Sequence, residues 1–285
     1  MKRIYRWTLA AMTALFFVTA QAASPLLPDY SDLWSVPGES GWGVHVTLQD
    51  DVVFLVIYVH DTSSEPRFYV ATDMRPTAQS PSQQPVFSGA LYRTQGSPFA
   101  AAFDPARFDA KPVGNATLRL VSSGSAVLSY DVQGVAVTKT LARQALRALS
   151  LASDYLGGTF VSTNGCTAGA GLPALSFPGT IKVAQAGDDV VIDTRFEPGF
   201  TEVGTCRLTG KLFQEGSIAT IRGTYACEFS AGVNPMSGTF EIIDLEAAEK
   251  GFSGRYRAID GACVHTGRIG GIRRGYTVVA PPEDP

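Results

Sequence analysis

The chain has 285 residues, of which 45% are hydrophobic, and its 26 acidic and 23 basic side chains give a formal net charge of −3 at pH 7. This acidic balance argues against nucleic acid and against an anionic membrane surface as general partners. The 29 glycines and 17 prolines are scattered between short apolar runs, a composition that favours many turns and short strands.

Residues 1–22 have the pattern of a secretory signal peptide. Lys2, Arg3 and Arg6 form a basic start, residues 9–18 are mostly apolar, and an Ala-Gln-Ala sequence ends the segment. No cysteine follows the apolar run, so we expect no lipid anchor there. No later stretch approaches the roughly 18 apolar residues that a membrane-spanning helix needs. We therefore expect an exported protein, periplasmic or secreted, with no membrane-spanning segment in its mature chain.

Two tryptophans, Trp34 and Trp42, lie on either side of a Pro-Gly pair, which favours a type II turn. The simplest interpretation is that both indoles pack in or cap a small β core, because aromatic rings dominate such cores. The alternative is an exposed platform for a sugar ring or an apolar ligand, with Glu39 and Ser40 as its polar contacts. Trp34, Glu39 and Trp42 are therefore candidate ligand-binding residues.

The same stretch has the pattern Trp-x-x-Pro-x-Glu-Ser-Gly-x-Gly at residues 34–43, and Ser88-Gly-Ala-Leu-Tyr-Arg-Thr94 follows later. These two motifs resemble those of a family of secreted proteobacterial proteins. The resemblance covers residues 30–145 and implies no established activity.

The first half reads as an antiparallel β domain over residues 23–141. Period-two alternation and apolar runs between turn residues predict strands at residues 44–48, 52–60, 67–72, 86–93, 116–121, 126–132 and 134–141. Seven strands of this length fit a small meander sandwich or barrel. Between them, residues 95–112 contain Phe99, Phe103 and Phe108 among three prolines, and we expect an irregular flap that buries these rings.

Residues 141–153 contain no glycine or proline and are rich in Ala, Leu and Arg. This is the only window of the mature chain with a helical propensity, although a strand that extends into a linker fits it equally well. We place the linker between the two domains at residues 142–154.

In the second half, residues 155–275, apolar runs separated by short turns predict eight strands. They lie near residues 156–163, 176–185, 189–196, 203–213, 217–228, 237–245, 250–259 and 262–272. Eight sequential antiparallel strands favour an up-and-down barrel, because closure removes the sheet edges. The pattern looks like a lipocalin or avidin barrel by analogy of fold only. A Gly-x-aromatic motif (called the phrase below) occurs four times, with its ring at Phe160, Tyr225, Phe240 and Tyr256. Because residues two apart in a strand share a face, each ring should lie on the same face as its glycine. We expect residues 276–285 to form a disordered tail.

All four cysteines lie in this second half. An even number in an exported chain favours two disulfides, and three connectivities are possible. Cys166 follows the first predicted strand of a closed barrel and Cys263 begins the last, while Cys206 and Cys227 fall on consecutive strands. The nested pairs Cys166–Cys263 and Cys206–Cys227 are thus compatible with a barrel. Without closely spaced cysteine or histidine ligands, the sequence predicts no metal site.

Several residue types capable of chemistry are present without a recognisable motif. The chain has no nucleophile elbow, phosphate-binding loop or dinucleotide fingerprint, so we predict neither catalytic residues nor a cofactor. His45 and His60 are interpreted as structural residues. His265, by contrast, is a candidate for the lining of a barrel mouth. Arg268 lies three residues further on, in a cluster with Arg273 and Arg274 that fits either an exposed strand end or an anion-recognition rim.

The sequence therefore favours an exported, non-enzymatic binding or interaction protein. Its ligand, a small molecule, would lie in the mouth of the second barrel or at the Trp34 and Trp42 patch, since barrel mouths are common pockets. A structural protein that meets other envelope proteins through its sheet faces is the alternative. A hydrolase acting on glycans or esters comes third, and it would need a carboxylate pair, or a hydroxyl and a histidine, converging in one cleft.

Overall fold

The computed structural model describes residues 29–77, 84–164, 166, 174–197, 203–230, 235–261 and 263–275. The expected signal peptide and the expected C-terminal tail lie outside these residues. The described chain consists of strands, with one 3-10 turn, η1, as its only helical element. In this described part, no helix is long and apolar enough to cross a membrane.

The first half forms a closed antiparallel barrel in which each strand pairs with its neighbour in sequence. The barrel closes where β1 pairs with β8, with Trp34 opposite Arg143. Its strands are β1 (Asp32–Ser35), β2 (Gly43–Gln49), β3 (Val52–His60), β4 (Pro66–Pro76), β5 (Val86–Gln95), β6 (Asp109–Leu120), β7 (Ser125–Val132) and β8 (Val135–Arg143).

The seven predicted strands are all present, and the eighth, β1, was missed. β1 has four residues, too few to show alternation, and it ends just before the predicted turn. Gly38 takes a φ of 85° in that turn, as a Pro-Gly pair predicts. The extra strand supplies the partner that β8 needs, so the domain closes as a barrel and does not open into a sandwich.

The interior of the first barrel is filled by side chains. Alternate residues of every strand point inward, and large apolar side chains such as Trp34, Leu55, Phe87 and Leu128 are completely or almost completely buried. An eight-stranded barrel is just wide enough to be filled in this way.

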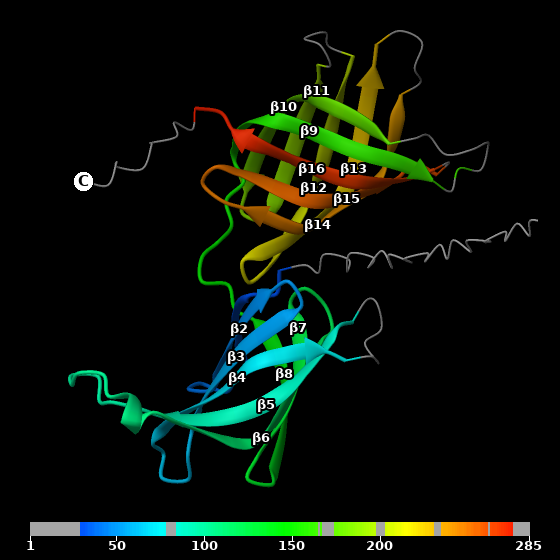
Figure 1. Cartoon of the computed structure of the whole chain (residues 1–285). Helices are drawn as coiled ribbons and strands as arrows, with labels where there is room; N and C mark the ends of the chain where they lie inside the picture. The colour runs from blue at the N-terminus through cyan, green and yellow to red at the C-terminus, as the bar shows by residue number, and fades with distance from the viewer. Residues whose placement is uncertain are drawn as a thin grey trace, which may run out of the picture.

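The prediction of a flap that buries Phe99, Phe103 and Phe108 was wrong. Strands β5 and β6 continue beyond the barrel as a long hairpin, with η1 (Pro105–Arg107) near its tip (Figure 1). All three rings are exposed to solvent. The reason is geometric, since the hairpin projects from the barrel wall and no second layer covers it.

The second half forms a second closed barrel, as predicted, with β9 pairing with β16 at the seam. Its strands are β9 (Ser153–Asn164), β10 (Leu175–Ala186), β11 (Asp189–Phe196), β12 (Gly204–Glu215), β13 (Ile218–Phe229), β14 (Met236–Ala247), β15 (Gly251–Ile259) and β16 (Val264–Arg273). All eight predicted strands are confirmed, with boundaries that shift by a few residues.

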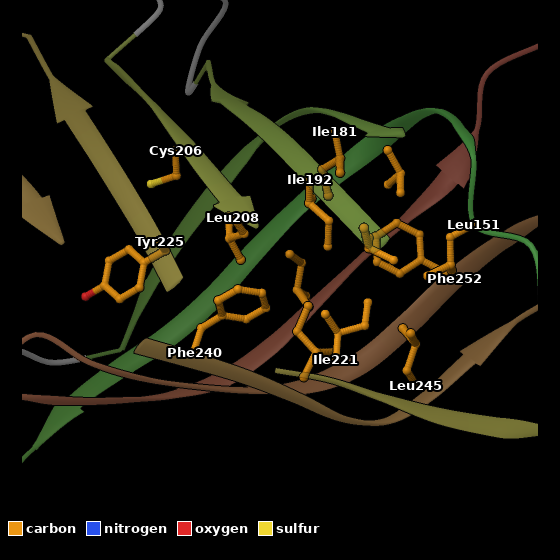
Figure 2. Close-up of a cluster of buried hydrophobic side chains, with 14 of the residues drawn as sticks. Leu151, Ile181, Ile192, Cys206, Leu208, Ile221, Tyr225, Phe240, Leu245 and Phe252 are labelled. Carbon is orange, nitrogen blue, oxygen red and sulfur yellow. The ribbon is translucent and has the colours of Figure 1, made fainter. Parts of the chain in front are cut away.

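The core of the second barrel extends along the barrel axis from the linker end. Figure 2 shows Leu151, Leu245 and Phe252 at one end of this cluster and Cys206 and Tyr225 at the other. At the linker end the interior is sealed by bulky side chains, because β9, β13, β14 and β15 all place large apolar residues there.

The segment between the barrels contains no helix, so of the two interpretations of residues 141–153 the helical one was wrong and the strand that extends into a linker is observed. β8 continues to Arg143, and β9 begins at Ser153. In between, Leu149 and Leu151 alternate with exposed residues and pack into the core of the second barrel. The side-chain oxygens of Gln214 and Gln185 accept hydrogen bonds from the backbone N–H groups of these two leucines at 2.8 Å. The extended segment therefore leaves neither of these N–H groups unpaired.

The two barrels meet where the turn between β12 and β13 touches the closing seam of the first barrel (Figure 1). The backbone N–H of Ser217 donates to Asp32 at 2.7 Å, and Arg143 donates to the Ser217 hydroxyl at 3.2 Å. Gly216 lies between these groups with a φ of 67°, and a Cβ atom there would come within 2.4 Å of both Arg143 and Asp32. The contact therefore depends on a residue with no side chain.

Candidate ligand pocket in the second barrel

The second barrel contains a cavity of about 130 Å³ at the end opposite the first barrel. The turn between β12 and β13 contacts the first barrel, whereas Cys206 and Cys227, which line the cavity, pair near the other ends of those strands. We call this cavity the barrel pocket. It extends inward from partly exposed residues such as His265 to the buried side chains of Leu208 and Ile269.

Period-two alternation places the lining residues in the barrel pocket. On β9 the inward residues are Thr159, Val161 and Thr163, each separated from the next by one residue that faces outward. β16 contributes His265 and Ile269, which lie opposite Thr163 and Thr159 across the seam. The pocket is thus formed by regular strands, which hold side chains more rigidly than loops do.

One wall of the barrel pocket is aromatic. The rings of Phe177 and Phe196 lie 5.2 Å apart between centroids, and those of Phe196 and Phe229 lie 6.4 Å apart and nearly parallel. The three rings come from β10, β11 and β13. Such a row of rings offers an apolar surface for contact with another ring.

Both disulfides lie at this end of the barrel and form the nested pairs. Cys206–Cys227 joins residues directly opposite each other on β12 and β13 and faces the pocket. Cys166–Cys263 joins the segment after β9 to the start of β16, next to the barrel seam. The two bonds tie four strand ends together around the opening.

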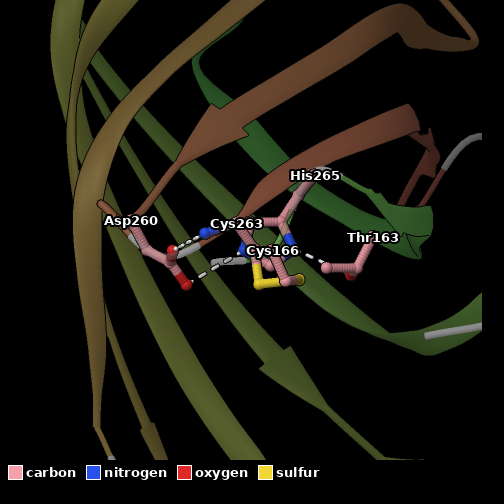
Figure 3. Close-up of a disulfide and its surroundings, with 5 residues drawn as sticks. All are labelled: Thr163, Cys166, Asp260, Cys263 and His265. Atoms are coloured by element: carbon pink, nitrogen blue, oxygen red, sulfur yellow. Dashed lines mark hydrogen bonds and ion pairs between the residues drawn. A yellow bond between two sulfur atoms is a disulfide. The ribbon is translucent and has the colours of Figure 1, made fainter. Parts of the chain in front are cut away.

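His265 is held by two side chains at the rim of the barrel pocket (Figure 3). Its Nδ1 lies 3.0 Å from the Thr163 hydroxyl, and its Nε2 lies 3.1 Å from the Asp260 carboxylate. Thr163 and His265 are paired in register across the seam. In the neutral imidazole, the nitrogen that faces the carboxylate carries the hydrogen, and Nδ1 accepts from the threonine hydroxyl.

Two tyrosines supply further polar groups to the barrel pocket. Burial, followed by the nearby charge of Asp260, raises the pKa of Tyr225 to about 12. Burial, followed by the neighbouring Tyr225, also raises the pKa of Tyr256 far above its ordinary value. Both phenols therefore stay protonated at neutral pH and present O–H groups.

The structure separates the five residues that the sequence singled out for ligand binding. Among them, only His265 lines the barrel pocket. Arg268 is exposed on the outer face of β16, because it lies an odd number of positions from His265. Trp34 is 1% exposed in the core of the first barrel and offers no surface to a ligand.

Glu39 and Trp42 lie close to each other, without forming a cavity. Glu39 makes an ion pair with Lys139 at 2.6 Å, and the Lys139 ammonium lies 5.9 Å from the centre of the Trp42 ring. The Trp42 Nε1 donates to the Tyr130 hydroxyl at 3.4 Å. The polar groups of this patch are thus occupied by partners in the barrel itself.

Sequence reasoning missed most of the residues that form the barrel pocket, including Tyr225, Phe177 and Phe196. A signal for one of them was present, since Tyr225 ends a Gly-x-aromatic phrase. In three of the four phrases the ring faces the barrel interior, whereas Phe160 faces outward. The phrase predicts a shared strand face but not which face, because that depends on the register of the whole barrel.

Other candidate chemistry does not converge in the described structure. The acidic pairs of residues 50–51 and 188–189 lie at turns, where Asp51 and Asp189 make ion pairs with Arg75 and Lys211. Among the described residues, no group of three or more His, Cys, Asp or Glu side chains is arranged to hold a metal ion.

Comparison with known proteins assigns no family. No family model and no curated protein matches the chain. The crystal structure of isotype 1 transferrin binding protein B from serogroup B Neisseria meningitidis aligns with 82% of this chain and 66% of that chain, at 8% sequence identity and a TM-score of 0.31. A likeness at this level carries no argument about function.

Proposed function

We propose that this protein is an exported binding protein that holds a small, mostly apolar molecule in the open end of its second barrel. The observation that carries the proposal is the barrel pocket, a cavity of about 130 Å³ lined mainly by apolar side chains. The first barrel offers no comparable interior among the described residues, because its core is filled by its own side chains.

Export is supported by two observations. Residues 1–22 have the basic, apolar and small-residue order of a signal peptide. Both cysteine pairs form disulfides, which persist in oxidising compartments such as the periplasm and the extracellular space. The protein would meet its ligand on that side of the membrane.

An esterase is the second candidate, and one specific observation favours it. Thr163, His265 and Asp260 form a chain of hydroxyl, imidazole and carboxylate at the rim of the pocket. In such a chain the imidazole would take the hydroxyl proton while the hydroxyl attacks an ester carbonyl. It ranks second because Thr163 is buried, and its bond to His265 also serves to join two paired strands.

The two candidates are separated by p-nitrophenyl acetate hydrolysis at neutral pH. A binding protein gives the same rate for the wild type and for Thr163→Val. An esterase gives catalytic turnover that Thr163→Val abolishes, and this result would overturn the ranking.

The binding proposal is tested with fluorobenzene as a probe, followed by ¹⁹F NMR. We expect a saturable shift or broadening of the fluorine signal in the presence of the wild-type protein. Val161→Trp should abolish it, because Val161 faces the pocket and the indole would fill the cavity. The matched control is Ser162→Trp, the next residue on the same strand, which faces outward and should leave binding intact.

Thermal unfolding of both tryptophan variants shows whether each barrel remains folded. A wild-type protein that gives no saturable fluorine response would overturn the proposal. Equal loss of binding in Val161→Trp and Ser162→Trp, with both variants folded, would place the binding site elsewhere.

A further inference from the structure

Tyr225 lines the barrel pocket, and its hydroxyl group is a buried polar atom without a partner. Tyr225 is 5% exposed, and its oxygen has no hydrogen-bond partner in the described structure. Three other polar side chains at the pocket do have partners, since Thr163 bonds to His265, and Thr194 donates to the backbone carbonyl of Cys206 at 3.3 Å.

A buried hydroxyl without a partner is costly. Leaving such a group unsatisfied loses the hydrogen bonds it made to water, so buried polar atoms in folded proteins almost always have a partner. An unpaired polar atom on a side chain that lines a cavity therefore marks a place where a ligand atom would bind. The raised pKa keeps the Tyr225 phenol protonated, so its O–H group can donate to a hydrogen-bond acceptor.

The volume of the cavity limits the ligand to about one ring. An engineered cavity of about 150 Å³ with an apolar lining binds benzene, and the barrel pocket is similar in size at about 130 Å³. The row of Phe177, Phe196 and Phe229 supplies ring faces and edges against which a second ring packs well.

Charge limits the ligand further. No lysine or arginine side chain lines the pocket in the described structure, and the Asp260 carboxylate acts on Tyr225 from nearby. A carboxylate or phosphate ligand would therefore lose its hydration and meet a negative charge. The site favours a neutral molecule.

We infer that the barrel pocket takes a neutral, single-ring aromatic compound with one hydrogen-bond acceptor on its substituent, such as an aryl ketone, and that the Tyr225 hydroxyl donates to that acceptor. This inference rests on the proposed function and specifies its ligand class. The ring would pack against the three phenylalanines, and the carbonyl oxygen would replace the missing partner of Tyr225.

The test compares two probes of nearly the same shape, acetophenone and α-methylstyrene, which differ by a carbonyl oxygen in place of a methylene group. Binding of each to the full chain is measured by competition with fluorobenzene in ¹⁹F NMR, for the wild type and for Tyr225→Phe. The phenylalanine keeps the ring and removes only the hydroxyl. We expect the ratio of ketone to alkene affinity to fall by about tenfold in Tyr225→Phe, the effect of losing one hydrogen bond.

A second variant, Tyr256→Phe, removes the other phenol that lines the pocket and so tests which of the two hydroxyls donates. Its affinity ratio should remain that of the wild type. An unchanged ratio in Tyr225→Phe, or a change that appears only in Tyr256→Phe, would overturn the assignment of the donor while leaving the binding proposal in place. Failure of both probes and of fluorobenzene to bind would instead overturn the proposed function.

Discussion

Arg143 Nε donates a hydrogen bond to Asp32 Oδ2 across 2.9 Å, and the two side chains are only 0% and 11% exposed. The same carboxylate oxygen accepts the backbone N–H of Ser217 from the second barrel. One buried ion pair thus closes the first barrel, by joining β1 to β8, and also anchors the second barrel to it.

Arg143→Met should destabilise the protein by about 3 to 5 kcal/mol, because it leaves the Asp32 carboxylate buried without its counter-charge. The free energy of unfolding in urea measures this effect. Lys139→Met is the matched control, since Lys139 lies on the same strand but pairs with Glu39 near the surface. That change should cost no more than about 1 kcal/mol, and equal losses in the two variants would contradict the prediction.

The contact between the barrels should weaken in acid. Burial acts to raise the pKa of Asp32, but the Ser217 and Leu33 N–H groups and the charge of Arg143 together lower it below its ordinary value of 3.8. A carboxyl group with a lowered folded-state pKa adds stability above its unfolded pKa, and this stability is lost as the pH falls through the folded value.

The stability that Asp32 adds should therefore be fully present above pH 3.8 and disappear below it. Asp32→Asn removes this titration, so the difference in unfolding free energy between wild type and variant should shrink as the pH is lowered from 6 to 2. Urea unfolding at several pH values measures that difference. A difference that stays constant over this range would show that Asp32 does not carry the effect.

Loss of the disulfides should destabilise the second barrel alone. The sequence separations of 21 for Cys206–Cys227 and 97 for Cys166–Cys263 correspond to about 3 and about 5 kcal/mol of loop-closure entropy. Paired Cys→Ala replacements test each bond. The tryptophans of the described chain lie in the first barrel, so their fluorescence should keep its urea midpoint while the far-UV circular dichroism shows an earlier transition.

If the fluorescence and the circular dichroism both shifted to the same lower urea midpoint, the two barrels would unfold as one unit. The contact through Ser217 would then be strong enough to couple them. Adding Arg143→Met to the cysteine variant should separate the transitions again.

The projecting hairpin should tolerate polar residues. Replacing Phe99, Phe103 and Phe108 together by serine should change the unfolding free energy by no more than about 0.5 kcal/mol per site, because the rings are already exposed. The same variant should associate less with itself in sedimentation experiments, since exposed rings favour contacts between molecules. Phe87→Ser is the contrasting change, because Phe87 is completely buried and its loss should unfold the first barrel.

The overall fold was largely predictable because strand periodicity is a local property. All eight strands of the second barrel and seven of the first were identified from alternation and turn residues. β1 escaped because four residues show no period, and its role is to pair with β8, more than a hundred positions away in the chain. Residues 144–152 were ambiguous for a related reason, since two distant glutamines, and not local propensity, keep them extended.

The site was less predictable than the fold. His265 could be placed at a barrel mouth because it lies near the start of the last strand, and strand ends lie at the ends of a barrel. Trp34 and Trp42 seemed equivalent in the sequence, although one is buried at the barrel seam and the other is half-buried beside Lys139. Whether Arg268 faces the interior or the solvent depended on the register of β16. That the Tyr225 hydroxyl lacks a partner depends on the positions of all the side chains around it, which no local sequence pattern contains.

The pairing of first and last strands also determines the order in which the chain can fold. β9 begins at Ser153, yet the strand that protects its edge ends at Arg273, so the second barrel stays open until β16 has been synthesised. An unpaired edge of this length is prone to join the wrong strand, including one from another chain. Truncation even a few residues before Arg273 should therefore yield aggregates more often than a shortened barrel. The Cys166–Cys263 bond likewise has to wait for Cys263, which immediately precedes β16.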